Sequence, residues 1–349
     1  MLVSEVPAFR DYWYPVCYSE ELGDKPRHFR LFGENWVTWR DGDAVARGAR
    51  DRCPHRSARL SMGWLSDGCL VCPYHGWRFD SDGRCVEIPA APPDLPVPPK
   101  ARLDGILVDE RYGLVWVCVG MPAEGIPVLP ELEDPDYTLV HELMEEWAAS
   151  APRCIDNALD VSHLSFVHRA SIGSDANPRM SDYELERDGH RLRFTISYIA
   201  RVPEQQKRNT GITDDFITRV THAELVQPFV FRGVLEYPNG LRHVLYKTAA
   251  PVDDEHTLFC QFIARNDDPD NERQQGIVSV DRTVQCEDRG LLEGIEADFP
   301  LTPTAELHTR SDRMTLEYRK ILADLADAST LRPPTGRRVE AAHTTRRDE

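Results

Sequence analysis

The sequence predicts an α+β protein with an all-β N-terminal domain and a C-terminal domain in which helices pack on an antiparallel sheet. Residues 28–120 contain short runs of alternating apolar and polar residues, broken by Gly and Asp, as half-buried strands are. Residues 153–168 are predicted as a helix, and strand-like runs follow from 189 to 265. Residues 276–297 and 306–326 have the apolar spacing of amphipathic helices.

Two Pro-rich stretches mark the domain organisation. Residues 89–100 cannot form regular helix or central strand, so they are predicted as an extended surface segment of the all-β domain. Residues 119–137 are predicted as an inter-domain linker. The domains are therefore expected at 1–125 and 126–329, and the polar, Arg- and Pro-rich tail at 330–349 is expected to be disordered.

Composition excludes several classes of function. The chain has 349 residues and a formal net charge of −17, which argues against a nucleic-acid partner. No apolar run approaches the roughly 20 residues that span a bilayer, and the N-terminus lacks the features of a signal peptide. We therefore expect a cytoplasmic protein without a membrane partner. Its nine cysteines are then expected to be metal ligands or buried thiols rather than disulfides.

The first motif is a set of four candidate metal ligands, Cys53, His55, Cys72 and His75. They follow the pattern C-x-H, sixteen residues, then C-x-x-H. Four N/S ligands indicate either zinc or an iron–sulfur cluster. Cys and His alternate here on two loops of a strand-rich region, which favours a [2Fe–2S] cluster with both Cys on one iron and both His on the other. A structural zinc site is the alternative.

Other small residues surround this motif. Four glycines within and just after it would supply tight turns and close backbone approach around a cluster, namely Gly63, Gly68, Gly76 and Gly83. Cys69 and Cys85 lie outside the pattern and are predicted to be buried thiols.

The second motif is DNALDVSHLSFVH. On a continuous helix, Asp156, Asp160 and His163 would share one face. His163 and His168 would be about 140° apart on such a helix, so both can bind one metal only if the helix ends or bulges near Ser165.

Two histidines require a third ligand. O2 chemistry at Fe(II) typically uses two His and one carboxylate. Asp288 is the best candidate, because Leu291, Leu292 and Ile295 share its helix face, and a carboxylate on an apolar face is costly unless it is paired or metal-bound. The alternative is a buried Asp that caps a helix or pairs with an Arg. Asp298 is the second candidate ligand.

The neighbouring acidic residues fall mostly off this face. Glu287, Glu293 and Glu296 are therefore expected to be solvated. The remaining histidines lie outside any motif and are assigned no role.

Together these residues resemble the Rieske non-haem iron oxygenase family. CPHR…CPYHGW resembles the cluster motif of that family, DNALDVSHLSFVH its iron motif, and EDRGLLEGIE its late helix, in which an Asp after Glu completes the iron triad. The resemblance covers about residues 8–325. The length is similar to that of the single-subunit-type branch, which includes the vanillate and dicamba O-demethylases.

The resemblance implies a Rieske [2Fe–2S] domain, a helix-grip catalytic domain and a ring-shaped homotrimer. Within it His163, His168 and Asp288 would bind mononuclear Fe(II), and Asn157 would sit near the iron. Asp160 would bridge to the cluster of a neighbouring subunit.

The function implied is that of a terminal oxygenase. It would activate O2 with electrons from the Rieske cluster, to hydroxylate or oxidatively dealkylate a small aromatic or natural-product substrate. Because no dinucleotide or flavin motif is present, NAD(P)H would act only through a separate reductase, with or without a ferredoxin. The alternatives are a ring cis-dihydroxylating dioxygenase, a Rieske electron-transfer protein without oxygenase activity, and a zinc-binding interaction module.

Overall fold

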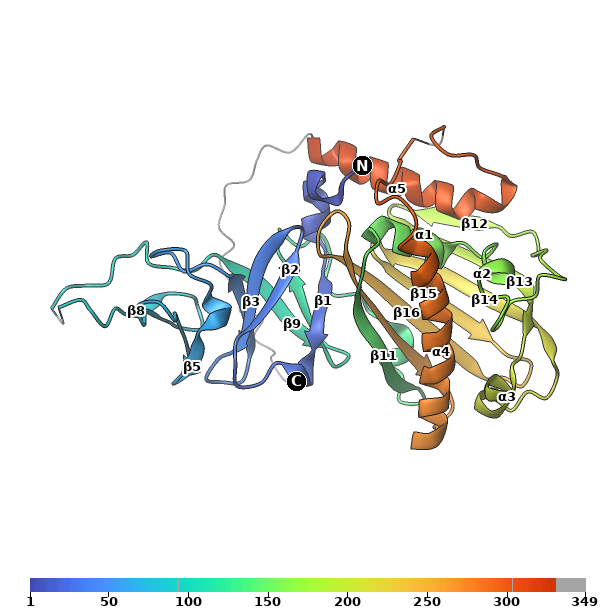
Figure 1. Ribbon diagram of the computed structural model, residues 1–349, viewed down its shortest axis with the longest axis horizontal. Coiled ribbons are helices and arrows are strands. Elements are labelled where there is room, and N and C mark those ends of the chain that lie inside the picture. Colours follow the sequence, from blue (N-terminus) through green and yellow to red (C-terminus); the bar gives the residue numbers. More distant parts are fainter. Residues whose placement is uncertain (93, 303, 331–349) are drawn as a thin grey trace. The chain divides into compact units, whose positions relative to one another are not determined.

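A computed structural model describes residues 1–92, 94–302 and 304–330 (Figure 1). The described chain divides into two compact units. One unit is Arg10–Ile126, and the other combines Met1–Phe9 with Pro127–Thr330. The first nine residues are predicted to belong to the 1–125 domain, but they group with Pro127–Thr330 instead. The backbone N–H of Ser4, for example, donates to the carboxylate of Asp254 at 2.8 Å. The predicted tail falls, from residue 331 on, outside the described residues.

The Arg10–Ile126 unit contains two antiparallel sheets. The larger has the order β1-β10-β9-β4-β3-β2 and the smaller β5-β6-β7-β8. The strands are β1 (Tyr14–Tyr18), β2 (Arg27–Leu31), β3 (Glu34–Arg40), β4 (Ala46–Arg50), β5 (Trp64–Ser66), β6 (Cys69–Val71), β7 (Arg78–Phe79), β8 (Cys85–Glu87), β9 (Gly105–Arg111) and β10 (Leu114–Cys118). Every residue of β10 is buried, which explains its unbroken apolar sequence, LVWVC.

The other unit is built on a seven-stranded antiparallel sheet of order β11-β17-β16-β15-β14-β13-β12. Its strands are β11 (Thr138–Trp147), β12 (Leu185–Asp188), β13 (Arg191–Arg201), β14 (Phe216–Gln227), β15 (Val230–Glu236), β16 (Arg242–Pro251) and β17 (Thr257–Arg265). Its helices are α1 (Ala151–Leu159), α2 (Leu164–Val167), α3 (Glu204–Thr210), α4 (Asn271–Leu292) and α5 (Arg313–Thr330). The long α4 runs across the sheet in Figure 1, and this confirms the predicted α+β class and helix-grip arrangement.

Short 3-10 helices complete the described chain. They are η1 (Val3–Glu5), η2 (Pro7–Asp11), η3 (Ser19–Glu21), η4 (Leu60–Met62), η5 (Pro130–Leu132) and η6 (Arg310–Asp312).

The helix predicted over 153–168 is interrupted. It ends at Leu159, and Asp160 is extended (φ −79°, ψ 125°). Oδ1 of Asp160 accepts hydrogen bonds from the backbone N–H and the hydroxyl of Ser162, both at 2.7 Å, so the side chain stabilises a turn in place of another helical residue. The predicted common face of Asp156, Asp160 and His163 is therefore wrong, and the break precedes His163 rather than falling near Ser165.

The late helices are also shifted along the chain. α4 begins at Asn271 and ends at Leu292, so Ile295 lies beyond it. Leu291 is 47% and Ile295 39% exposed, and the predicted apolar face is not formed by them. Asp288 is nevertheless buried, with 2% of its surface exposed.

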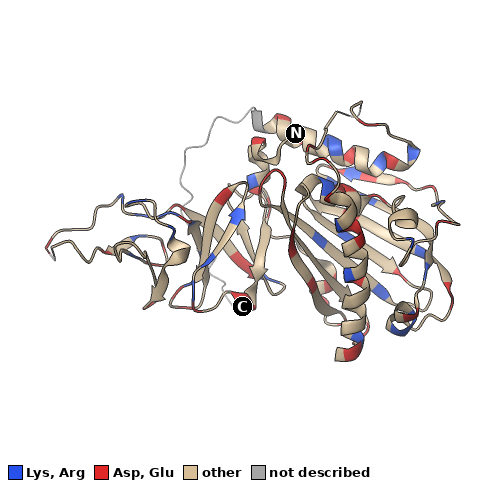
Figure 2. Ribbon diagram, in the orientation of Figure 1, with Lys and Arg blue, Asp and Glu red and all other residues tan. Residues whose placement is uncertain are grey.

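Thiols and charges are distributed through both units. All nine cysteines are free, Cys85 is buried as predicted, and Cys69 is half-buried. Lys and Arg are interspersed with Asp and Glu along α4 and α5 (Figure 2). Among the described residues, no helix is long and apolar enough to cross a bilayer.

Candidate metal centres

The structure brings His163, His168 and Asp288 together. One ligand atom of each lies within 4.8 Å of the other two. Nε2 of His163 is 3.4 Å from Oδ1 of Asp288, and Nε2 of His168 is 3.2 Å from the same oxygen. His168 is fully buried and Asp288 nearly so. The two imidazoles of the second motif and the carboxylate of Asp288 thus converge on one point.

The interruption between α1 and α2 makes this convergence possible. His163 immediately precedes the single turn of α2 and His168 immediately follows it, so both rings face the same point. The following loop turns back tightly, and the N–H of Gly173 donates to the carbonyl of His168 at 2.8 Å. A Cβ atom at Gly173 would lie 2.3 Å from the carbonyl oxygen of Leu164, so the turn has no room for a side chain.

The outer nitrogens of both histidines face carboxylates. Nδ1 of His168 lies 2.8 Å from Oε2 of Glu287, which also accepts a hydrogen bond from Ser171 Oγ at 2.6 Å. Nδ1 of His163 lies 3.6 Å from Oδ2 of Asp160. Carboxylates placed in this way fix the tautomer and orientation of metal-binding imidazoles.

The expectation that Glu287 is solvated is wrong. Its side chain turns toward the loop after α2 and contacts His168 and Ser171 there. The spacing of apolar residues does not reveal the role of Glu287. A buried imidazole that binds a metal needs a hydrogen-bond partner on its second nitrogen, and a search for that partner could have found this residue.

Electrostatics favour a cation at the convergence point. Burial alone would raise the pKa of Asp288, but the neighbouring imidazoles of His163 and His168 and the charge of Lys247 outweigh it and hold that pKa well below its usual range. Burial likewise opposes ionisation of His163, yet the carboxylates of Asp160 and Asp288 raise its pKa to about 9.

Buried His168 Nε2 has no hydrogen-bond partner among the described residues. Two histidines and one carboxylate around a common point are the donor set that holds non-haem Fe(II) with open positions, so these residues fit a mononuclear iron.

Of the remaining polar candidates, one contacts the triad and two pair with other residues. Nδ2 of Asn157 donates to Oδ1 of Asp288 at 3.0 Å, so Asn157 supports the triad. Asp156 instead pairs with Arg319, at 2.6 and 3.1 Å. Asp298 is exposed and pairs with the terminal ammonium of Met1, and it is not one of the three converging residues.

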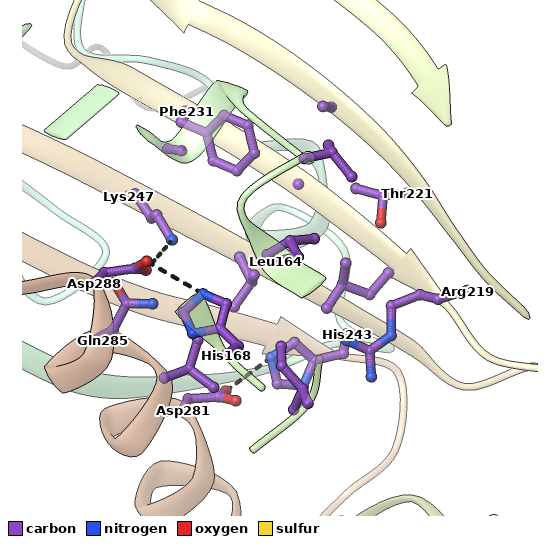
Figure 3. A pocket seen from close by; sticks show the side chains of 18 of the residues that line it. Leu164, His168, Arg219, Thr221, Phe231, His243, Lys247, Asp281, Gln285 and Asp288 are labelled. Carbon is purple, nitrogen blue, oxygen red and sulfur yellow. Dashed lines mark ion pairs between the residues drawn. The ribbon is translucent and has the colours of Figure 1, made fainter. Parts of the chain in front are cut away.

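The triad forms part of the wall of a cavity between the sheet and α1, α2 and α4 (Figure 3). Alternate residues of the strands form one wall, as the period of a strand requires. The lining comprises Asn157, Ala158, Asp160, Val161, His163, Leu164, His168, Ile172, Tyr198, Gln206, Arg219, Thr221, Ala223, Phe231, Gly233, Leu235, Tyr237, His243, Leu245, Lys247, Gln261, Val280, Asp281, Val284, Gln285 and Asp288.

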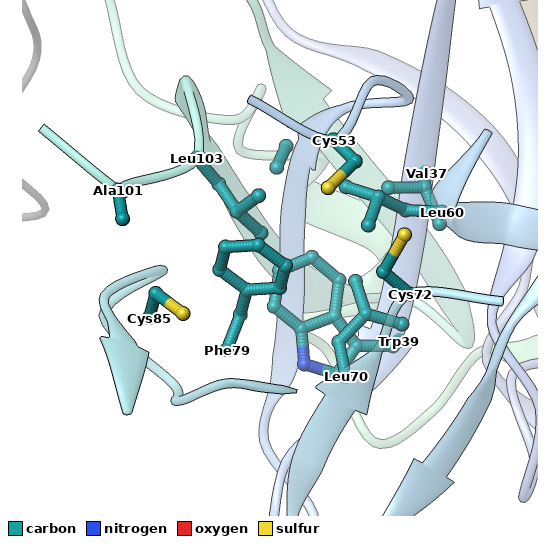
Figure 4. Close-up of a cluster of buried hydrophobic side chains, with 11 residues drawn as sticks. Val37, Trp39, Cys53, Leu60, Leu70, Cys72, Phe79, Cys85, Ala101 and Leu103 are labelled. Carbon is teal, nitrogen blue, oxygen red and sulfur yellow. The ribbon is translucent and has the colours of Figure 1, made fainter. Parts of the chain in front are cut away.

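The second candidate centre lies in the Arg10–Ile126 unit, where Cys53 and Cys72 are buried in an apolar core. Figure 4 shows both side chains in this core, and the thiol of Cys53 interacts with that of Cys72. Burial raises the pKa of the Cys53 thiol to about 11, so this thiol needs a bound metal to become a thiolate at neutral pH.

The two cysteine loops have the same backbone pattern. The carbonyl of Cys53 accepts from the N–H of Ser57, and that of Cys72 from the N–H of Gly76. Gly76 has a φ of +70°, which glycine adopts without strain. The N–H of each cysteine donates to the carbonyl five residues later.

The matching histidines, His55 and His75, are exposed, with ring centroids 4.6 Å apart. The ring of His55 also stacks on Trp77. Zinc would draw all four ligand atoms to one point at about 2.0–2.3 Å, but no three of these four residues bring their ligand atoms within 4.8 Å of one another. A buried cysteine pair and an exposed histidine pair fit a two-iron cluster instead.

Comparisons with known proteins match both units. Residues 12–103 match the Rieske [2Fe-2S] domain, and residues 147–328 match the vanillate O-demethylase oxygenase C-terminal domain. The chain is 31% identical over 330 residues to methylxanthine N1-demethylase NdmA of Pseudomonas putida, covering 91% of this chain and 90% of the relative. It is 29% identical over 338 residues to methylxanthine N3-demethylase NdmB of the same organism, with the same coverage.

Solved structures agree with these matches. The structure of Pseudomonas putida NdmA with caffeine has a TM-score of 0.80 and 30% identity, covering 94% of both chains. Dicamba monooxygenase bound to dicamba has a TM-score of 0.79 at 22% identity, covering 93% of this chain and 99% of the other, and supports the fold alone.

Proposed function

The chain belongs to the Rieske oxygenases with a catalytic domain of the vanillate O-demethylase type, and on this basis we propose that it removes a methyl group from nitrogen or oxygen of a small aromatic substrate. The observation that carries the proposal is the triad of His163, His168 and Asp288 in the wall of a cavity, in a chain similar over nine-tenths of its length to two N-demethylases.

The protein is an oxidoreductase that uses O2, a Rieske [2Fe–2S] cluster and mononuclear iron, and it works with a separate reductase or ferredoxin. This confirms the predicted enzyme class and cofactors. The electron-carrier alternative is not favoured because a catalytic oxygenase domain spans residues 147–328. The zinc module is not favoured because residues 12–103 match a Rieske domain.

Within this class we assign the cluster to Cys53, His55, Cys72 and His75. The buried cysteines would hold one iron and the exposed histidines the other, so the histidine side faces a redox partner. Replacing thiolates with neutral imidazoles raises the reduction potential of such a cluster.

We assign the mononuclear iron to His163, His168 and Asp288. Donation by His168 Nδ1–H to Glu287 keeps the lone pair of Nε2 free for the metal. Donation by Asn157 to Oδ1 holds the Asp288 carboxylate in place. When bound, the iron supplies the activation of O2, and these neighbours keep its three ligands oriented.

The cavity suits a small organic substrate. Leu164, Phe231 and Leu245 give it apolar walls, which exclude water near the reacting group. The buried Oε1 atoms of Gln261 and Gln285 have no hydrogen-bond partner among the described residues, so they remain available to polar groups of a substrate.

We also propose a homotrimer in which Asp160 accepts a hydrogen bond from His75 of a neighbouring subunit. The carboxylate of Asp160 already faces His163, and His75 is exposed and accessible to a second chain. Electrons would then pass between subunits.

A cytoplasmic location is consistent with nine free cysteines.

The test is a reconstituted assay. Holoenzyme, a separate reductase and NADH are mixed with N-methyl and O-methyl aromatic compounds, and formaldehyde, demethylated product and O2 consumption are measured. Removal of one methyl group consumes one O2, two electrons and two protons, and releases formaldehyde and water. Equal amounts of formaldehyde and demethylated product are expected. A ring diol containing both oxygen atoms, without formaldehyde, would contradict the proposal.

A further inference from the structure

A buried glutamate lies beside the cavity, on the edge strand β11 of the seven-stranded sheet. The pairing of β11 with β17 shifts register between His141 and Leu143, so Glu142 sits in a β-bulge. Bulges redirect a side chain, and that of Glu142 is buried, with 6% of the residue exposed. Nε2 of Gln261 donates to its Oε2 at 2.7 Å, whereas its buried Oε1 accepts no hydrogen bond from any described residue. A buried carboxyl group with so few donors is costly as an anion, and a proton on Oε1 removes that cost.

The acidic partner of Glu142 is Asp281 of α4, to which its carboxyl group is hydrogen-bonded. Burial and the charge of Asp281 raise the pKa of Glu142 well above its usual range. Burial would also raise the pKa of Asp281, but His243, Glu142 and Arg265 outweigh it and lower that pKa. The two carboxyl groups therefore share one proton, with Glu142 as the neutral donor and Asp281 as the charged acceptor.

The surroundings of the pair keep Asp281 ionised. Nη1 of Arg265 lies 3.2 Å from Nδ1 of His243 and can only donate to it, so the proton of His243 is on Nε2. This nitrogen is 3.0 Å from Oδ2 of Asp281, as the dashed line in Figure 3 marks. Further charged or titratable groups that act on the pair are Lys247, Arg219 and Tyr237.

The pair lies between the cavity and a groove that β11 and α4 form. The groove is lined by His141 and Arg282, the chain neighbours of Glu142 and Asp281, and by the exposed Ser279. Nη1 of Arg282 donates to the carbonyl of Glu142 at 3.1 Å, which ties the two elements together at this point. Asp281 itself belongs to the wall of the cavity that contains the triad. The pair thus connects a solvent-facing groove with the cavity.

Polar groups continue from this pair toward the metal site. On α4, Asp281, Gln285 and Asp288 follow one another at i, i+4 and i+7, so they share one face, and all three line the cavity. Asp281 and Asp288 are two turns, about 10 Å, apart. The buried Oε1 of Gln285 has no partner among the described residues and can accept a hydrogen bond from a water molecule between them.

We propose that Glu142 and Asp281 relay protons from the groove between β11 and α4 into the cavity, where oxygenation consumes them. The O–H bond of Glu142 breaks as its proton passes to Asp281, Asp281 releases a proton to water in the cavity, and solvent in the groove returns a proton to Glu142. Two such passages supply the two protons that accompany the two electrons for each O2, and the separate reductase supplies the electrons. The inference rests on the oxygenase reaction of the proposed function. It applies to methyl removal and to ring dihydroxylation alike, because both consume two protons.

The first measurement is infrared spectroscopy of the oxidised holoenzyme at neutral pH, without turnover. Wild type is expected to show the C=O stretch of a protonated carboxyl group, and this band should be lost in Glu142→Gln. Glu146→Gln is the control, since Glu146 is an exposed glutamate of the same strand, and it should keep the band. In D2O the band should shift within the mixing time, because the groove gives solvent access to the acid. No difference between wild type and Glu142→Gln, or a band that does not exchange in D2O, overturns the inference.

The second measurement is the pH profile of product formation with the reductase. Glutamine keeps the size of Glu142 and can hydrogen-bond to Asp281 and Gln261, but it cannot pass on a proton, so a merely structural role would survive in Glu142→Gln. The rate is expected to fall at least about tenfold and to decrease more steeply with rising pH than in wild type, with iron content and substrate binding unchanged. Glu146→Gln should keep the rate and profile of wild type.

A wild-type rate and pH profile in folded Glu142→Gln overturn the relay, even where the infrared band is lost. A ring diol without formaldehyde, formed at a rate that still depends on Glu142, would contradict the demethylase proposal and support the relay. Formaldehyde at a rate that does not depend on Glu142 would support demethylation and remove the relay.

Discussion

At the scale of single residues, Glu287 connects α4 to the proposed iron site. Its carboxylate contacts His168 Nδ1 and Ser171 Oγ. Glu287→Gln keeps the shape but removes the charge that stabilises the Nδ1–H tautomer. We expect the affinity for the mononuclear iron to fall about 10–100-fold while the cluster is retained. Iron titration of protein that lacks only the mononuclear iron measures this.

Glu296→Gln is the matched control, because that glutamate is exposed and lies beyond α4. An iron affinity equal to wild type in Glu287→Gln, or an equal loss in Glu296→Gln, would mean that Glu287 does not orient His168.

Residue types and spacing predict the convergence of His163, His168 and Asp288, because ligands are chemically distinctive and a buried carboxylate needs a partner. Arg219 and His243, which line the cavity, could not be found in the same way. A lone arginine or histidine carries no motif, and its role depends on strand register, which places side chains from distant segments on one face.

At the scale of elements, the tight loop after α2 positions His168. A Cβ at Gly173 would lie 2.3 Å from the Leu164 carbonyl oxygen and 2.9 Å from backbone atoms of His168. Gly173→Ala should therefore open the turn, displace His168, destabilise the protein by about 1–3 kcal/mol and reduce bound mononuclear iron. Thermal unfolding and iron analysis measure the two effects.

Gly290→Ala is the opposite control, since that glycine lies on α4 with no atom within 4 Å of an added Cβ. It should stabilise the protein by about 0.5–1 kcal/mol, because alanine favours a helix interior. Equal behaviour of the two variants would show that the turn at Gly173 tolerates a side chain.

Strands and helices are predictable where their periodicity is regular, as in the strand-like runs over 189–265, which the structure folds into β13 to β17. A break in this helix is anticipated near Ser165, but its position at Asp160 is not, because the side chain of Asp160 replaces helical hydrogen bonds with bonds to Ser162. The residues on both sides of Asp160 have a helical pattern, so the pattern does not show that side-chain hydrogen bonds compete here with the backbone hydrogen bonds of a helix.

At the scale of the whole molecule, the proposed trimer makes Asp160 a link between two subunits. Asp160→Asn should leave both metal sites occupied and the trimer intact, yet lower product formation by orders of magnitude. Ser162→Ala is the control, since it removes one hydrogen bond to Asp160 without removing the charge. Single-turnover kinetics of the pre-reduced protein measure cluster oxidation on mixing with O2 and substrate. Oxidation as fast as in wild type would contradict the link.

The two motifs, read in order, predict the two units, because each metal centre needs a domain to hold it. The grouping of Met1–Phe9 with the catalytic unit could not be predicted in this way. It depends on single contacts, such as Ser4 with Asp254 and the Phe9 ring with Phe229, that join segments far apart in the sequence.

The most direct test of the two-centre account is iron analysis and electron paramagnetic resonance of wild type and Asp288→Ala. Wild type is expected to hold about three irons per chain, two in the cluster and one in the triad. Asp288→Ala should hold about two, with an unchanged Rieske signal and no product, whereas Asp298→Ala should match wild type because Asp298 is an exposed partner of Met1. A third iron and retained oxygenation in Asp288→Ala would contradict the account.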